Sequence, residues 1–455
     1  MMLLEFKIKN YKSFTTETCF SMFAAPKQHG LNYSILKESI NKKTIRALSS
    51  TVIYGPNASG KTNLIGAMET LKSIILRGNI KNTETGRTHN IASSLLELIP
   101  NRDANMNEPV EFTLKFTECG LLFEYFLSVN LGRFMESAAE RRIIEESLSV
   151  NQQNVFLRKY SPEEPKAEKL TTGFLGVISD FLPNELCDNI TGAQKLAEGN
   201  LNPKELFLTN GFKNIFSQKI VNIITDWLEK KFITIYRADV TELLPEISTP
   251  AKDTVYVDNM LNKAVKIFGL GGDEIGYIKT EDKPAVLSSA FEGKKNVIIP
   301  AELFESYGTV RFAKVIYPLV FNALSNGGVL AADEFDASIH PMALMSIINA
   351  FHNDEINING AQLIFNTHNP VFLNSNLFRR DEIKFVDREE GAEGSILYSL
   401  ADFKTVGRAG VRKGENYQKN YFISKYGAIR DIDFSTIFKE ALQHKAEAGQ
   451  IHDIS

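Results

Sequence analysis

The segment "VIYGPNASGKTNLI", residues 52–65, limits what the chain can fold into more than any other stretch. Gly55, Gly60, Lys61 and Thr62 have the spacing G-x-x-x-x-G-K-T. The run before this loop is β-branched and apolar, and apolar residues recur at helical spacing after it. A glycine-rich loop between a strand and a helix N-terminus lets backbone N–H groups surround a phosphate. We therefore expect a nucleotide-binding loop.

Individual residues of this loop have distinct expected roles. Lys61 is long enough to contact the outer phosphates, and the hydroxyl of Thr62 can ligate Mg²⁺. Asn57, Gly60 and Asn63 complete the expected nucleotide-binding set. The alternative is a glycine turn that matches by chance, which the strand, the loop and the helix together disfavour.

Two adjacent acids follow a second apolar run, in "GGVLAADEFD". Asp333 and Glu334 would then lie at the C-terminal end of a strand, where open α/β sheets place their ligands. Asp333 is suited to hold Mg²⁺, directly or through water, and Glu334 to orient or polarise the water that attacks a γ-phosphate. The alternative is a pair of surface acids at a strand end.

A histidine ends a further apolar run, in "LIFNTHNP". His368 is placed to hydrogen-bond a γ-phosphate or the attacking water, although a lone histidine is more often structural. His340, just before Pro341 at a helix start, belongs either to a subunit contact or to the core.

Small and polar residues precede an amphipathic helix in "ELFESYGTVRF". Ser306, Gly308 and Thr309 look by themselves like an ordinary helix N-cap. Taken together with the acid pair that follows, they fit a loop that approaches a γ-phosphate held by another subunit.

Composition excludes several classes of protein. With 455 residues, 43% apolar and 23% charged, the chain has room for two or three compact units. No window approaches the length of apolar sequence that spans a membrane, so we expect a cytoplasmic protein. Cys19, Cys119 and Cys187 are widely spaced and predict neither a disulfide framework nor a zinc site.

Charge gives a weaker signal. The net charge of -4 argues against bulk coating of nucleic acid. Residues 401–430 nevertheless hold seven cations and two anions, interleaved with aromatic residues. This basic stretch is either a solvated face over core aromatics or a surface that binds an anion or a partner.

Three regions are expected along the chain. Residues 1–160 would form an N-terminal lobe with strands at 3–8 and 18–23, the phosphate loop, and an antiparallel meander from 110 to 150. Residues 161–285 have helical patterning and predict a helical insertion or short arm. Residues 286–455 alternate between helix and strand after 310 and would form a C-terminal lobe.

The order of the motifs resembles a known family. "IKNYKSF", "GPNASGKT", "ESYGT", "VLAADEFDASIHP" and "NTHNP" follow one another as in ABC-type ATPases of the SMC, RecF and OLD branch. Within that branch the chain is most similar to compact anti-phage ATPases of the AbiL/RloA, PARIS and Septu systems. The resemblance is strong at 1–70 and 300–430, and the region 160–285 matches no motif.

That resemblance implies an α/β fold: a P-loop ABC-type ATPase head, with a mixed sheet, an antiparallel β subdomain and a helical insertion. It implies ATP and Mg²⁺ as cofactors, with Ser306 and Gly308 as the signature that meets the nucleotide of another copy. Asp336 would signal across the dimer and His368 would be the switch histidine. A Q-loop glutamine is not recognisable.

We expect an ATP-hydrolysing sensor or scaffold of bacterial anti-phage defence, of the abortive-infection type. It would form a head-to-tail dimer or higher oligomer and control a separate effector, a nuclease. DNA or a phage protein would be the trigger, and no membrane would be involved. An SMC-like clamp is disfavoured because the helical region shows no sustained heptads.

Three alternatives belong to other classes. A self-contained nuclease of the OLD type would need a glutamate plus a D-x-D pair after His368, and none is found there. A RecF-like DNA-repair ATPase would use residues 401–430 to contact DNA, with binding that weakens steeply as salt rises. A transporter ATPase subunit fits poorly with the "NYKSF" turn.

Overall fold

The structure is a computed structural model. It describes residues 1–26, 30–81, 98–104, 108–132, 141–163, 168–173, 178–182, 190–236, 255–279, 285–292, 297–388, 394–403, 411, 414–430 and 433–451.

A six-stranded sheet carries the phosphate loop. Its strands, in order across the sheet, are β11 (Phe232–Ile235), β16 (Val329–Ala332), β17 (Gln362–Asn366), β5 (Ser50–Tyr54), β18 (Ile383–Asp387) and β19 (Ile396–Ser399). The first five run parallel, and β19 pairs antiparallel with β18. Strands β5, β16 and β17 are buried along their whole length, as a parallel sheet covered on both faces requires. Their C-terminal ends meet at one edge of the sheet.

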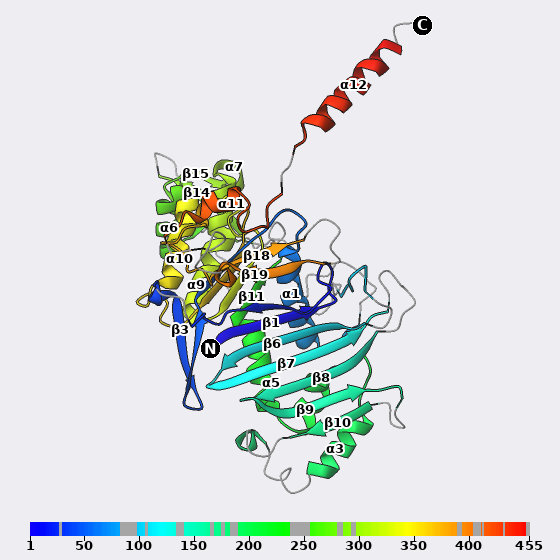
Figure 1. The fold of residues 1–455 in the computed structure, drawn as a ribbon. Helices are drawn as coiled ribbons and strands as arrows, with labels where there is room; N and C mark the ends of the chain where they lie inside the picture. Colours follow the sequence, from blue (N-terminus) through cyan, green and yellow to red (C-terminus); the bar gives the residue numbers. More distant parts are fainter. Residues whose placement is uncertain are drawn as a thin grey trace.

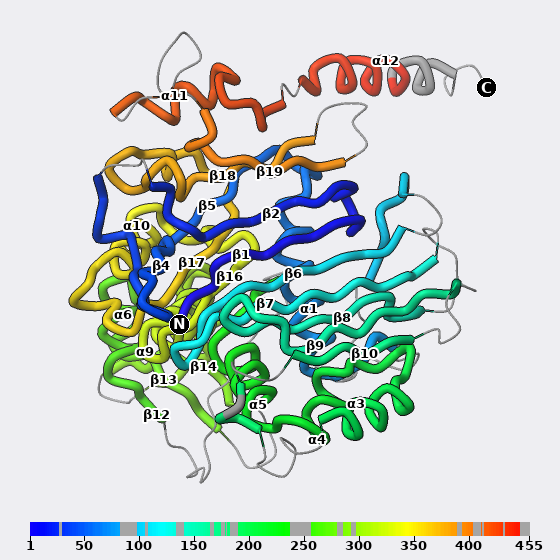
Figure 2. The backbone as a smooth tube through the Cα atoms, turned by 60° about the horizontal axis from the view of Figure 1, so that its bottom comes forward, coloured from blue at the N-terminus to red at the C-terminus, as the bar shows by residue number. Residues whose placement is uncertain are grey.

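A seven-stranded antiparallel sheet lies beside it (Figures 1 and 2). Its order is β10 (Glu168–Thr172), β9 (Gln153–Tyr160), β8 (Arg142–Val150), β7 (Leu121–Asn130), β6 (Val110–Glu118), β1 (Met2–Lys9) and β2 (Thr18–Ser21). The two predicted N-terminal strands and the predicted meander are therefore confirmed. Burial alternates along β6 up to Lys115, because one face of this sheet covers the core, and the last three residues of the strand are all buried.

The two faces of the parallel sheet pack against different helices and so belong to two separate cores. On one face, Ile53 of β5 packs in the core that includes α1 (Lys61–Arg77) and the antiparallel sheet. On the other face, Val52 and Tyr54 pack in the core that includes α9 (Tyr317–Asn326) and α10 (Pro341–His352). This alternation follows from the period of two along a strand, and it fixes α1 between the two sheets.

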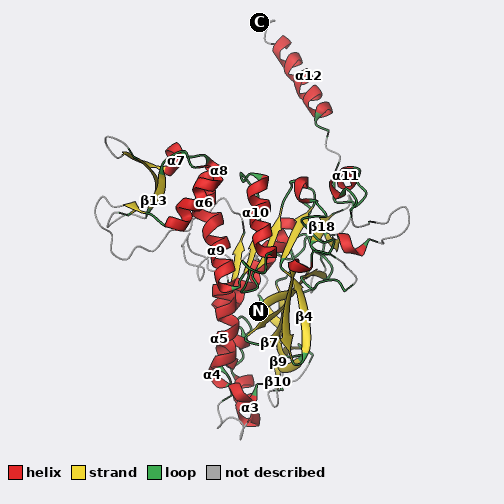
Figure 3. Cartoon of the chain, turned by 90° about the vertical axis from the view of Figure 1, so that its left-hand side faces the viewer, coloured by secondary structure: helices red, strands yellow, loops and turns green. Residues whose placement is uncertain are grey.

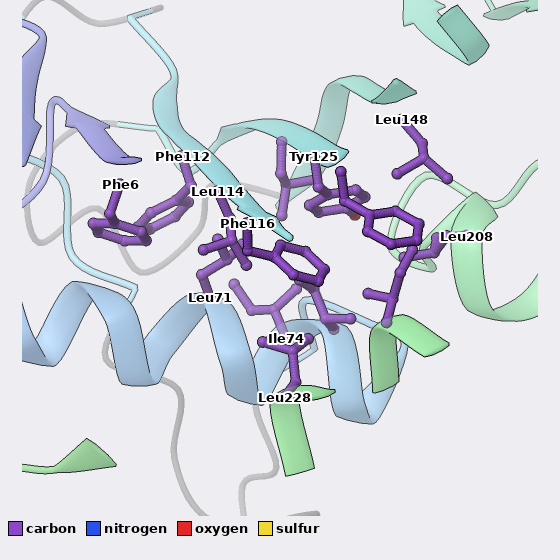
Figure 4. Packing of buried hydrophobic residues seen from close by; sticks show 14 of the residues in the cluster. Phe6, Leu71, Ile74, Phe112, Leu114, Phe116, Tyr125, Leu148, Leu208 and Leu228 are labelled. Carbon is purple, nitrogen blue, oxygen red and sulfur yellow. The ribbon is translucent and has the colours of Figure 1, made fainter. Parts of the chain in front are cut away.

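Aromatic and aliphatic side chains fill the space between α1 and the antiparallel sheet (Figure 4). Phe112 and Phe116 of β6 face the helix residues Leu71 and Ile74, and all four are buried. Burying a side chain of this size stabilises the fold by about 1.5–3 kcal/mol. The packing holds the helix that begins at the phosphate loop in a fixed direction.

The segment 161–285 differs from the predicted helical arm. Its helices include α3 (Ile190–Gly199), α4 (Lys213–Ile215), α5 (Gln218–Asp226) and α6 (Asn259–Gly269). However, β10 extends the antiparallel sheet and β11 extends the parallel sheet. Trp227, which follows α5, stacks on Phe116 with ring centroids 4.1 Å apart. The segment is therefore built into both large sheets, and only its tertiary packing could reveal that.

A small lobe lies on one side of the molecule (Figure 3). Its sheet consists of β12 (Val255–Tyr256), β13 (Glu274–Ile278), β14 (Val286–Phe291) and β15 (Val297–Pro300), all antiparallel. It leads into α7 (Ala301–Phe304) and α8 (Tyr307–Arg311), and the helical path continues through η7 (Phe312–Ile316) into α9. The alternation of helix and strand predicted after residue 310 is present here and in the strands β16, β17 and β18.

The remaining elements lie at the periphery. They are the hairpin β3 (Ile35–Ile40) and β4 (Lys43–Leu48), α11 (Tyr417–Phe422) and α12 (Ser435–Ile451). Helix α12 extends away from the body of the molecule (Figures 1 and 3). Within the described part of the chain, no helix combines the length and the apolar character needed to cross a membrane.

Candidate nucleotide-binding site

The loop from Gly55 to Gly60 turns tightly between β5 and α1. Gly60 has φ 113°, and an added Cβ there would lie 2.5 Å from Ser13 Oγ. An added Cβ at Gly55 would lie 2.1 Å from the carbonyl oxygen of Val386 on β18. Gly55 is therefore required by the close approach of the β18 backbone, and Gly60 by its positive φ and the neighbouring Ser13 side chain. Ala58, with φ 62°, also takes a left-handed conformation.

Lys61 points back into the loop that precedes it. Its Nζ donates to the carbonyl oxygens of Gly55 at 2.8 Å and Pro56 at 2.9 Å. Burial lowers the pKa of Lys61 from 10.5 to about 8, although the charges of Asp333 and Glu334 act in the opposite direction. A triphosphate in this loop would supply the negative charge that favours the protonated amine.

The acid pair lies where the sequence predicts it, directly after β16. Asp333 is buried, and its Oδ1 accepts a hydrogen bond from Thr62 Oγ1 at 3.0 Å. This contact joins the phosphate loop to the acid pair across the sheet edge. Glu334 is exposed and faces the cavity described below.

Asn366, the last residue of β17, connects the two acids. Its Nδ2 donates to Asp333 Oδ1, and its Oδ1 accepts from the backbone N–H of Glu334 at 2.5 Å. This residue was not predicted from the sequence. A polar residue at the end of the strand between β5 and β16 is the signal that could have identified it.

His368 lies two residues beyond Asn366 and lines the same cavity. Partial burial and the charge of Lys61 lower the pKa of His368 below 6.5, against the opposing effect of Asp336 and Asp333. Both effects favour the neutral imidazole in the chain without nucleotide. A neutral imidazole can donate one hydrogen bond and accept another, as a phosphate and water contact requires.

A cavity of about 540 Å³ opens beside the loop, a volume typical of small-molecule sites. The predicted residues that line it are Asn57, Gly60, Lys61, Thr62, Asn63, Glu334 and His368. The structure thus brings the phosphate loop, the second acid and the histidine together. Asp333 completes the group through its contact with Thr62.

Other residues that line the cavity were not predicted. They are Lys12, Ser13, Ala58, Arg388 and the run from Ile99 to Asp103. Ser13 Oγ accepts from Asn63 Nδ2 at 2.9 Å, and Asn101 Nδ2 donates to the Lys12 carbonyl at 2.8 Å. The "NYKSF" motif contains Lys12 and Ser13 and could have identified them, whereas nothing in the sequence marks the run from 99 to 103.

Ser306 and Gly308 lie elsewhere, at the start of α8. Ser306 Oγ accepts from the Thr309 N–H at 3.1 Å and is the N-cap of this helix. Neither residue lines the cavity of its own chain, as far as the described residues show. The capping role weighed from the sequence is therefore present, and the signature role stays a prediction.

Two further predicted residues, His340 and Asp336, lie in the loop between β16 and α10. His340 is exposed and caps α10, since its Nδ1 accepts from the Met342 N–H at 3.2 Å. The core position considered for His340 is thus wrong, and the subunit contact stays a prediction. Asp336 Oδ2 accepts from Thr367 Oγ1 at 2.6 Å, which ties the loop after β16 to the end of β17.

The donor set fits Mg²⁺. Thr62 and Asp333 present a hydroxyl and a carboxylate 3.0 Å apart at the mouth of the phosphate loop. Mg²⁺ in nucleotide sites takes one or two protein oxygens and completes its octahedron with phosphates and water. In the parts of the chain that the structure describes, no group of three His, Cys, Asp or Glu gathers as a metal site. A cation here would draw its other ligands from the nucleotide and from water.

A phosphate loop after a central parallel strand, with an acid pair at the same sheet edge, defines a P-loop nucleotide-binding fold. The family model described as "AAA domain, putative AbiEii toxin, Type IV TA system" matches residues 50–176 and 205–374. These two segments cover more than half of the chain, which therefore belongs to this ATPase family. A search of curated proteins gave no match.

Among solved structures, the chain is similar to "SMC head domain from Thermotoga maritima". The two share 14% identity with a TM-score of 0.33, over 88% of this chain and 99% of the other. At that TM-score the superposition adds no support, and the fold rests on the strand order described above.

Proposed function

We propose that the protein binds ATP with Mg²⁺ and hydrolyses it to ADP and phosphate. The observation that carries this proposal is the bridge from the phosphate loop to Glu334. Thr62 contacts Asp333, and Asn366 contacts both Asp333 and the backbone of Glu334. One hydrogen-bonded unit thus links the residues expected to hold the phosphates, the cation and the attacking water.

Each residue has a defined part in the reaction. The loop N–H groups and Lys61 hold the phosphates, and the protonated amine neutralises charge that develops on them. Mg²⁺, held by Thr62 and Asp333, would polarise the β- and γ-phosphate oxygens. Glu334 orients the water for attack on the γ-phosphorus, and His368 donates to a γ-phosphate oxygen.

We also propose that the site of one chain is half of a composite site, which a second copy completes. Ser306 is exposed at the start of the helical path from 307 to 326, and it does not line the cavity of its own chain. A second copy placed head-to-tail would bring its Ser306 and Gly308 to the open side of the nucleotide. The serine hydroxyl, the glycine N–H and the helix dipole would then complete the phosphate cradle.

Variants test hydrolysis directly. Glu334→Gln keeps the shape of the side chain and removes the carboxylate, so turnover should fall at least about a hundredfold while ATP still binds. Glu355→Gln, at an exposed acid that does not line the cavity, is the matched control. Phosphate release and fluorescent-nucleotide titration measure the two quantities. Unchanged turnover in Glu334→Gln would refute the assignment.

Mixing experiments test the composite site. Lys61→Met and Ser306→Arg each disable a different half, so each variant alone should be inactive. A mixture should regain turnover, because one of the two sites in a mixed dimer has both halves intact. Absence of rescue, together with turnover per chain that does not change on dilution, would exclude the shared site.

We further infer a role in bacterial defence of the abortive-infection type. The family description names an AbiEii toxin of a type IV toxin–antitoxin system, and this description supports the inference. The protein would act as a nucleotide-dependent sensor or scaffold that controls a separate effector, a nuclease, with DNA or a phage protein as trigger. Copurification with the product of the neighbouring gene, with and without ATP, tests the partner. Loss of phage protection in the Glu334→Gln variant tests the role.

DNA binding in the manner of RecF is less well supported. Lys404, Arg408, Arg412 and Lys413 of the predicted basic stretch lie outside the described residues. Lys425, which is described, pairs with Glu415 at 2.9 Å. Duplex DNA binding that depends on ATP, weakens steeply with salt and is lost on changing Arg412 or Lys413 would establish this alternative.

A further inference from the structure

The backbone of Glu334 has an unusual conformation. Its φ is 48°, in the left-handed region that residues other than glycine rarely adopt. Ser338, four residues later in the same loop, has φ 60°. Such conformations persist when neighbouring groups hold them in place, and they cluster at functional sites.

Two side chains hold the backbone of Glu334, one at its N–H and the other at its carbonyl oxygen. Asn366 Oδ1 accepts from its N–H, as described above. The Glu334 carbonyl oxygen accepts from Arg311 Nη2 at 2.9 Å, and Arg311 Nη1 donates to the Ala337 carbonyl. Arg311 is buried, with 7% of its surface exposed. Its planar fork spans two carbonyl groups of one loop, which the single ammonium of a lysine cannot reproduce.

Arg311 also belongs to the helix that starts after Ser306. It is the last residue of α8, one turn beyond Gly308. An added Cβ at Gly308 would lie 2.4 Å from the carbonyl oxygen of Ser338, so the helix and the loop touch at a second point. The loop is therefore hydrogen-bonded to this helix through Arg311 and lies close against it at Gly308.

We propose that Arg311 is a positioning residue that holds the Glu334 backbone for hydrolysis and fastens it to the helix beginning at Ser306. The inference rests on the proposed function, in which Glu334 orients the attacking water. Because Arg311 joins this helix to the loop that carries Glu334, a shift of the Ser306 end on contact with a second copy would move that loop. Engagement at one composite site thereby sets the geometry of the carboxylate at the other.

Arg311→Lys and Arg311→Gln test the proposal. The first keeps the charge and the second keeps one planar donor, but neither spans both carbonyl groups. A misplaced carboxylate slows the chemical step and leaves nucleotide affinity intact. We expect kcat to fall at least about tenfold in both variants, with the Kd for ATP within about twofold of wild type.

Lys314→Met is the matched control. Lys314 lies three residues further along the helical path, is also buried, and pairs with Glu302 of α7. Its loss should lower the thermal unfolding temperature by an amount similar to that of the Arg311 variants. Its kcat should stay within about twofold of wild type, because the ion pair of Lys314 is made with α7, and the hydrogen bonds of Arg311 to the loop carrying Glu334 are left in place.

The outcomes separate the two proposals. If the wild type hydrolyses ATP and both Arg311 variants have the same kcat as the wild type, the positioning role is overturned and the proposed function is left intact. The positioning role is also overturned if Lys314→Met loses kcat as the Arg311 variants do, in proportion to its loss of stability. No hydrolysis by the wild type, with ATP bound, refutes the proposed function and this inference with it. If Arg311→Lys does not fold, the comparison of Arg311→Gln with Lys314→Met decides.

Discussion

The side chain of Asn366 holds the backbone of Glu334 and the carboxylate of Asp333 at the same time. The Asn366 Oδ1 accepts from the Glu334 N–H at 2.5 Å, and the Asn366 Nδ2 donates to Asp333 Oδ1. A side-chain amide can donate from its nitrogen and accept at its oxygen in one plane without carrying charge. The residue therefore sets the relative position of the two acids without itself carrying charge.

Asn366→Asp tests this arrangement. The change keeps the acceptor, removes the donor and places a second carboxylate against Asp333, so one of the two carboxyl groups has its pKa raised. A hydrogen bond to a charged group is worth about 1.5–3 kcal/mol, which corresponds to a ten- to hundredfold loss. We expect Mg²⁺-dependent ATP binding and kcat to fall by that factor, as measured by nucleotide titration and phosphate release.

Asn357→Asp is the control for this prediction. Asn357 is also buried and donates its amide to the carbonyl groups of Phe351 and Ala361, but it does not line the cavity. Its substitution should lower stability and leave ATP affinity unchanged. Equal effects of the two substitutions on ATP affinity would contradict the role given to Asn366.

The pKa of Lys61 predicts how stability without nucleotide changes with pH. Burial lowers that pKa from 10.5 to about 8 in the folded chain. Between these values the unfolded chain binds more protons, so the Lys61 contribution to the free energy of unfolding rises with pH. Below pH 8 the buried charge costs about 3 kcal/mol, and above pH 10.5 this cost is gone.

Lys61→Met removes this dependence. We expect the variant to exceed the wild type in free energy of unfolding at pH 7, and the difference between them to shrink by about 3 kcal/mol up to pH 10.5. Urea unfolding of both proteins across this range measures the difference, in which contributions of other titrating groups cancel. A difference that stays constant from pH 7 to 10.5 would show that Lys61 has an ordinary pKa.

Much of the site was predictable because its residues follow strands. The phosphate loop, Asp333 and His368 each end or follow an apolar run, and parallel strands bring such ends to one edge. Asn366 obeys the same rule, at the end of β17. Asn366 could not be predicted because a single amide belongs to no motif. Its role comes from the two acids that the sheet places beside it.

Other features depend on tertiary packing that local patterns do not encode. The four residues of β11 follow a helical run, and only their pairing with β16 makes them a strand. The run from Ile99 to Asp103 reaches the cavity through a bridge between Tyr11 and Pro100, which no periodicity signals. Arg311 looks like an ordinary helix residue until its contacts with the Glu334 and Ala337 carbonyls are seen.

Gly308→Ala tests the close approach of α8 to the loop after β16. The added Cβ would lie 2.4 Å from the Ser338 carbonyl oxygen, so the backbone must shift. We expect a loss of about 1–3 kcal/mol in the free energy of unfolding, as measured by urea denaturation. Gly199→Ala is the control, because nothing lies within 4 Å of its added Cβ, and it should change stability by less than about 0.5 kcal/mol. Similar stability of both variants would mean that the two segments are not packed as described.

Glu305 connects the small lobe to the residue that caps α8. Its carboxylate accepts from the N–H groups of Gly271 and Gly272 at 2.9 and 3.2 Å, and from Ser289 Oγ at 2.7 Å. Ser306 follows it directly in the chain. The position of Ser306 is therefore coupled to the turn before β13.

Glu305→Ala removes a carboxylate that accepts three hydrogen bonds. Each hydrogen bond to such a charged group is worth about 1.5–3 kcal/mol. We expect faster amide hydrogen exchange at Gly271 and Gly272, detected by mass spectrometry of a peptide that spans them. Glu302→Ala, on α7, is the control, because Glu302 pairs with Lys314 instead. Exchange that is equally slow in both variants would show that Glu305 does not hold the turn. If the turn loosens, turnover should fall as well, since Ser306 then loses the fixed position from which it would reach the nucleotide of a second copy.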